Sequence, residues 1–208
     1  MWLNCIFGGK GVGMINMLMY VIIGIFVAGM MVGRTPEYLG KKIQAREIKL
    51  VSLGILVTPL AVLATTGLAI ATRAGMRSIY QAGPQGFSET LYAYLSQANN
   101  NGSAFAGYTG FIQPNAPGNV EAFGISFADL LGGATMTLAR FLPIVLVLAV
   151  AGSLAGKKVS PAGPGTMRTD TPTFVILLVG VIVLVGALTF FPALLLGPIV
   201  QSLTTQLF

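Results

Sequence analysis

Four long apolar segments alternate with short polar segments along the chain. They are Met14–Gly33, Leu50–Thr72, Leu130–Gly156 and Thr171–Phe208. Each is long enough to span a membrane, because about 20 helical residues cross the roughly 30 Å hydrocarbon core of a bilayer. In the last segment we expect the helix to end near Pro192 and Pro198, since proline lacks the N–H that a helix needs. The pattern predicts an all-α integral membrane protein with four spanning helices.

The polar segment between the second and third apolar segments has an unusual pattern. From Glu89 to Glu121 it carries no charge between its ends, yet it is not apolar enough to span. Phe87–Ala98 is predicted to form a short helix, with Ser88 as its N-cap and Glu89 in its first turn. Such a helix is about 16 Å long, roughly half a bilayer. The small and polar residues of Asn99–Gly107 follow, and then a return rich in proline, glycine and asparagine.

A half-length helix, a turn of small residues and a spanning helix predict a re-entrant pore helix. Non-helical backbone at membrane depth survives only where protein buries it or where it lines water, and its free carbonyls can replace the water of a dehydrated cation. Gly102, Ser103 and Ala104 are small enough for this role. The glycine-rich stretch from Gly8 to Gly13 permits the same interpretation. An external loop with asparagine turns is the alternative for the segment after Ala98.

Composition excludes several classes of protein. The chain has 208 residues, of which 54% are hydrophobic and 9% charged, whereas about a quarter of a soluble domain is charged. It contains no histidine, and Cys5 is its one cysteine. Imidazole- and thiolate-based metal sites and histidine-based catalysis are therefore excluded, and we do not expect the chain to be an enzyme on its own. Gly11 follows Lys10 where a Walker A loop requires Ser or Thr.

The basic residues predict the orientation in the membrane. The loops after the first and third apolar segments carry eight of them: Arg34, Lys41, Lys42, Arg46, Lys49, Lys157, Lys158 and Arg168. The other side carries Lys10, Arg73 and Arg77. Positive residues favour the cytoplasm, so we place both loops there and the C-terminus outside. Basic residues confined to short loops between apolar segments favour a membrane partner over a nucleic acid.

Arg140 is the one charged residue within an apolar segment. An unpaired charge at the centre of a bilayer costs from about 2.5 to more than about 10 kcal/mol, so Arg140 should face a watery cavity or a partner. The alternative is a helix that starts later, with Arg140 reaching the interface. The run from Arg34 to Tyr38 is interpreted as a docking site or a structural corner.

Four strings of residues resemble one family over essentially the whole chain. They are Val32–Ile43, Gly83–Glu89, Asn99–Gly107 and Gly186–Leu194. They are similar to the potassium-binding A subunits of bacterial Kdp pumps. The resemblance implies a potassium-channel-like fold of four membrane–pore–membrane repeats with a four-part filter for external K⁺. It also implies partners: an ATP-hydrolysing B subunit, accessory C and F subunits, and the bacterial inner membrane.

The resemblance also assigns residues. Gly8, Gly9 and Gly11 match the third filter segment, and the fourth is matched by Asn101, Gly102, Ser103 and Ala104. Arg140 matches a family arginine below the filter, with a role in gating or in steering ions towards the tunnel to the ATP-hydrolysing partner. We expect Lys10 to point away from the pore, because it would otherwise oppose cation binding.

Members of this family are more than twice as long as this chain. We therefore expect a C-terminal fragment with two of the four filter segments. Residues 1–49 would hold the third filter segment, a spanning helix and a cytoplasmic loop; 50–156 the fourth repeat; and 157–208 a cytoplasmic loop and the last helix. Half of the filter carbonyls cannot replace a hydration shell, so the chain alone should not select ions. A membrane scaffold without transport activity is the alternative function.

Overall fold

The structure is a computed structural model that describes residues 12–81, 83–103, 107–108, 126–161, 163 and 165–204. Its elements are α2 (Val12–Val32), β1 (Glu37–Tyr38), β2 (Lys41–Lys42), α3 (Ala45–Ala71), α4 (Arg73–Met76), α5 (Gly83–Ala98), α6 (Phe127–Ala155) and α7 (Pro172–Leu203). Helices α2, α3, α6 and α7 are long and apolar enough to cross a membrane. The predicted all-α membrane fold with four spanning helices is confirmed.

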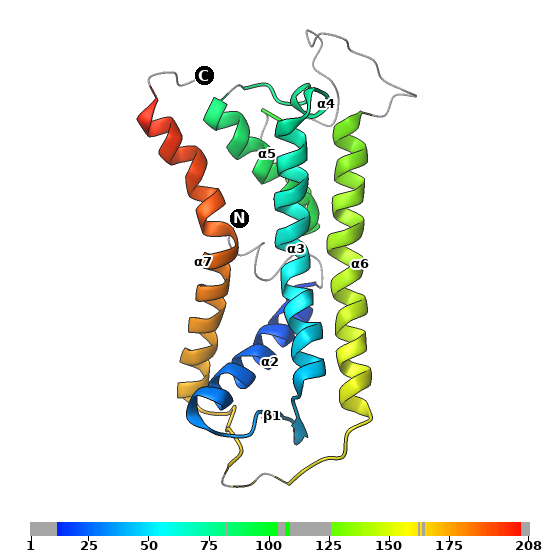
Figure 1. The fold of residues 1–208 in the computed structure, drawn as a ribbon, viewed down its shortest axis with the longest axis vertical. Coiled ribbons are helices and arrows are strands. Elements are labelled where there is room, and N and C mark those ends of the chain that lie inside the picture. Colours follow the sequence, from blue (N-terminus) through cyan, green and yellow to red (C-terminus); the bar gives the residue numbers. More distant parts are fainter. Residues whose placement is uncertain are drawn as a thin grey trace.

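The long helices stand side by side around the shorter α5. Helices α3, α6 and α7 follow the long axis of the molecule, and α3 packs against α6 over most of its length (Figure 1). Helix α5 enters between them from the upper end and finishes near mid-height, where α2 begins its oblique path to the lower end (Figure 1). Helix α5 contacts α3, α6 and α7. Its position is therefore fixed by three spanning helices.

Polar caps, and not the ends of the apolar segments, decide where two of the helices begin. Helix α3 starts five residues before the predicted Leu50, because Gln44 and Glu47 form a capping box. Helix α6 starts at Phe127, where the backbone N–H of Asp129 donates to Ser126 Oγ at 3.1 Å. The alternative in which the helix of the third segment starts later is therefore wrong, and Arg140 lies in the middle of α6.

The prediction for the start of α5 is wrong by one helical turn. The helix begins at Gly83 and has 16 residues, so it is about 24 Å long. Gly83 adopts a φ of +74°, which glycine tolerates, and Pro84 fits the first turn of a helix. Ser88 therefore lies inside the helix and is not its N-cap. Helix α5 remains shorter than the roughly 30 Å of a hydrocarbon core.

The predicted end of the last helix is also wrong. Helix α7 continues through Pro192 and Pro198 to Leu203. Each proline removes one helical hydrogen bond, but ending the helix in an apolar environment would leave several backbone groups without partners. The continuous helix is therefore the less costly arrangement.

The two basic loops meet at the lower end of the molecule (Figure 1). Strands β1 and β2 form a two-stranded antiparallel hairpin, and the backbone N–H of Ser160 donates to the carbonyl of Gly40 at 2.7 Å. Thr166 Oγ1 donates to Glu37 Oε2 at 3.1 Å, and Glu37 is buried. The run from Arg34 to Tyr38 thus forms a corner that holds the two loops together.

Gly197 makes the close contact between α7 and the start of α5. A Cβ atom at this position would lie 2.0 Å from Ser88 Oγ and 3.2 Å from the carbonyl oxygen of Pro84. We expect Gly197→Val to lower the free energy of unfolding by about 1–3 kcal/mol, the usual cost of overpacking. Thermal unfolding in detergent measures the change.

Gly180→Val is the matched control, because Gly180 lies in the same helix and a Cβ there would meet nothing within 4 Å. Equal melting temperatures for the two variants would contradict the assigned contact.

Candidate functional site

The C-terminal end of α5 is closed by a turn that asparagine and glycine make possible. The backbone N–H of Asn101 donates to the carbonyl of Ser96 at 2.9 Å, and that of Asn100 donates to Gln97 at 3.1 Å. This is the pattern of a Schellman motif, which needs a left-handed residue after the cap. Asn100 is that residue, with a φ of +56°, and Gly102 is also left-handed at +78°. The sequence at this turn therefore suits its unusual backbone.

The turn presents main-chain oxygens that are available to a ligand. In the part of the chain that the structure describes, the carbonyls of Asn101, Gly102 and Ser103 accept no hydrogen bond. All three residues are exposed. The C-terminal end of α5, where the helix dipole is negative, lies directly before them. Carbonyl oxygens at a negative helix end favour a cation.

Arg140 connects the turn to the middle of α6. Its Nη1 donates to Asn100 Oδ1 at 3.1 Å. Gln97 lies on the same side of α5, since a Cβ atom on Gly132 would be 2.6 Å from Gln97 Oε1. Arg140 is the fourteenth residue of α6, about 20 Å from the start of that helix. The turn therefore lies at the level of the central part of α6, at the depth where a membrane excludes irregular backbone from lipid.

The chain returns from the turn to the end at which α5 began. The backbone N–H of Tyr80 donates to the carbonyl of Gly107 at 2.8 Å, and Ile79 pairs with Tyr108 in an antiparallel bridge. Tyr108 also donates to the hydroxyl of Tyr94 at 2.8 Å. Residues before and after the turn thus meet at one end of the molecule. This is the path of a re-entrant segment.

Only part of the predicted site lies among the described residues. The structure brings Asn101, Gly102 and Ser103 together in the turn and places Arg140 beside it. Gly8, Gly9, Gly11, Ala104 and Lys10 lie outside the described residues. Their assignments stay predictions.

Three residues of the site were not found by sequence reasoning. Asn100 binds Arg140, and the hydroxyl groups of Tyr92 and Ser96 contact Ser103. The spacing of Tyr92 and Ser96 places them on one face of α5. A pair of hydroxyl side chains at this spacing in a mostly apolar helix was the available signal.

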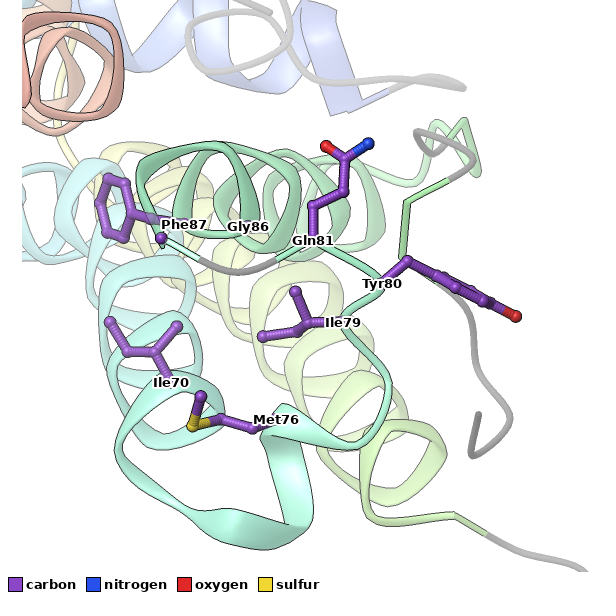
Figure 2. Close-up of a pocket in the computed structure, with 8 residues that line it drawn as sticks. Ile70, Met76, Ile79, Tyr80, Gln81, Gly86 and Phe87 are labelled. Atoms are coloured by element: carbon purple, nitrogen blue, oxygen red, sulfur yellow. The ribbon is translucent and has the colours of Figure 1, made fainter. Parts of the chain in front are cut away.

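A separate pocket of about 340 Å³ lies at the other end of α5 (Figure 2). Ile70, Met76, Ile79 and Phe87 surround it, and Tyr80 points away from them (Figure 2). The lining is mostly apolar and includes no charged side chain. It belongs to the start of α5, whereas the turn follows the end of α5. This pocket does not contribute to the candidate cation site.

Comparison with known proteins gives one consistent result. A family model described as "Potassium-transporting ATPase A subunit" matches residues 1–203. A relative from Sorangium cellulosum is 53% identical over 198 residues, which are 95% of this chain and 32% of the relative. One from Delftia acidovorans is 52% identical over 203 residues, or 98% of this chain and 34% of the relative.

A third relative, from Klebsiella pneumoniae, is 51% identical over 205 residues, which are 97% of this chain and 34% of the relative. All three relatives are named potassium-transporting ATPase potassium-binding subunits. The chain spans about a third of the length of these curated relatives.

Proposed function

Because the chain belongs to the family of potassium-transporting ATPase A subunits, we propose that it forms part of the K⁺-binding and translocating subunit of an ATP-driven potassium uptake complex. The observation that carries the proposal is the turn after α5. There the main-chain oxygens of Asn101, Gly102 and Ser103 lie without hydrogen-bond donors from the described residues, at the level of the middle of α6. Such oxygens can replace the water around a dehydrated K⁺.

In this proposal the turn is one segment of a four-part filter open to the outside. Ala104 completes this segment, and Gly8, Gly9 and Gly11 form a second. Both basic loops lie at the lower end of the molecule, opposite the end from which α5 enters (Figure 1). The positive-inside rule then places the lower end in the cytoplasm and the entry of α5 outside, in the bacterial inner membrane.

Arg140 has the role of a barrier in this proposal. Its guanidinium occupies the amide oxygen of Asn100, next to the turn. In the described part of the chain it has no acidic partner. A cation at this place repels an ion that leaves the filter, and so directs it towards the ATP-hydrolysing partner. The accessory C and F subunits complete the complex, and this chain supplies no ATP site.

The second candidate function is a membrane scaffold without transport. It is favoured by one observation, that the chain spans only about a third of its relatives. A scaffold has no reason to bind K⁺ more tightly than Na⁺.

Thermal unfolding separates the two functions. In a complete subunit that carries this region, we expect K⁺ at 100 times its dissociation constant to add about 2.7 kcal/mol to the free energy of unfolding. Na⁺ at the same concentration is the control, and it should add little. Equal melting temperatures in the two salts would favour the scaffold.

A further inference from the structure

Three polar side chains of α5 face the segment that returns from the turn. Glu89, Tyr92 and Ser96 are spaced by three and four residues, and residues at this spacing share one face of a helix. Tyr92 and Ser96 contact Ser103. Glu89 contacts Gly107, where a Cβ atom would lie 2.0 Å from Glu89 Oε2. The returning segment therefore follows this face of α5 in the opposite direction.

Ser103 is held by hydroxyl groups on this face. Tyr92 OH lies 2.9 Å from Ser103 Oγ, and Ser96 Oγ lies 3.4 Å from it. Ser96 is fully buried. Each hydroxyl can both donate and accept, so the three groups can form one chain of hydrogen bonds. Hydrogen bonds of this kind are stronger where protein and lipid exclude water.

Packing does not hold the neighbouring residue in place. A Cβ atom on Gly102 would meet nothing within 4 Å, so no side chain presses on this part of the turn. The contacts of Ser103 are therefore the side-chain bonds that hold the backbone after Gly102 against α5. Glu89 holds the segment again four residues later, at Gly107.

We propose that Tyr92 is a positioning residue for ion discrimination: through Ser103 it sets where the carbonyl oxygens of Gly102 and Ser103 stand relative to the ion. The proposal rests on the proposed function, because it concerns the same turn. Discrimination between K⁺ and smaller Na⁺ depends on the size of the cage of oxygens and on how freely they move. A turn released from α5 can close around Na⁺, and its preference for K⁺ falls.

The test is Tyr92→Phe in the complete subunit, assembled in its transport complex. The variant keeps the ring and removes one hydroxyl. We expect the KM for K⁺ in ion-stimulated ATP hydrolysis to rise about threefold to tenfold, the loss of one hydrogen bond. The ratio of KM for Na⁺ to KM for K⁺ should fall, while the maximal rate stays within about twofold.

Tyr94→Phe is the matched control. It makes the same change in the same helix and removes the bond of Tyr94 to Tyr108, at 2.8 Å, without a partner in the turn. We expect it to lower the melting temperature and to leave the ratio of KM values unchanged. A merely structural role of Tyr92 predicts the same result for Tyr92→Phe.

Two further variants make each outcome decisive. Ser103→Ala removes the same bonds from the other side, so it should lower the ratio as Tyr92→Phe does, and the double variant should be no worse than either. If Tyr92→Phe does not assemble, Ser103→Ala decides. An unchanged ratio in these variants, together with a lower ratio in Gly102→Ala, would overturn this inference and leave the proposed function standing. An unchanged ratio in all of them would overturn both.

Discussion

Replacing Lys157 with alanine is expected to lower the free energy of unfolding by about 3–5 kcal/mol, the usual cost of leaving one member of a buried ion pair alone. Lys157 Nζ lies 2.7 Å from Glu47 Oε2, and the side chains are 20% and 1% exposed. Glu47 belongs to the first turn of α3 and Lys157 to the loop after α6. The substitution leaves a buried carboxylate with neutral donors only, the hydroxyl of Ser153 and the N–H of Gln44.

The effect of Lys157→Ala is measured by unfolding in mixed detergent micelles. Lys158→Ala is its control, since Lys158 is the exposed neighbour and should change stability by less than about 0.5 kcal/mol. The double variant Glu47→Gln with Lys157→Ala should recover part of the loss, because it removes the uncompensated charge. Strictly additive losses in the double variant would contradict the ion pair as the cause.

Hydropathy predicted the four spanning helices, but it did not predict where they begin and end. The core of each helix depends on its own apolar residues, which the sequence displays directly. The ends depend on other terms. The capping boxes at Gln44 and Ser126 extend α3 and α6 into polar sequence, and the apolar surroundings allow α7 to continue through Pro192 and Pro198.

The candidate site could be predicted to the extent that it consists of backbone. Glycine and asparagine after a half-length helix indicate a turn with unusual φ values, and Asn100 and Gly102 have them. The side chains around the turn could not be predicted in the same way. The contacts of Tyr92 with Ser103 and of Arg140 with Asn100 join residues 11 and 40 positions apart. Those distances are set by how the segment returns and how α6 packs.

Gly102→Ala in the complete subunit is expected to raise the KM for K⁺ about tenfold or more and to weaken the preference for K⁺ over Na⁺. The φ of Gly102 is +78°, and a residue with a Cβ atom pays about 1–2 kcal/mol in this region. A Cβ atom here would meet nothing within 4 Å, so the cost is conformational and not steric. The turn relieves it by rotating its peptide groups, which moves the carbonyls away from the ion. A cost of about 1.4 kcal/mol per ion corresponds to a tenfold change in binding.

Ion-stimulated ATP hydrolysis at varied K⁺ and Na⁺ measures both effects of Gly102→Ala. Gly67→Ala is the matched control, because its Cβ atom would also meet nothing within 4 Å but it lies inside α3, where alanine is favoured. The control should leave both KM values unchanged. Because the strain is confined to one exposed turn, Gly102→Ala should also assemble and melt close to the parent. An assembled Gly102→Ala complex with the parent's KM for K⁺ would mean that the oxygens of this turn do not bind the ion.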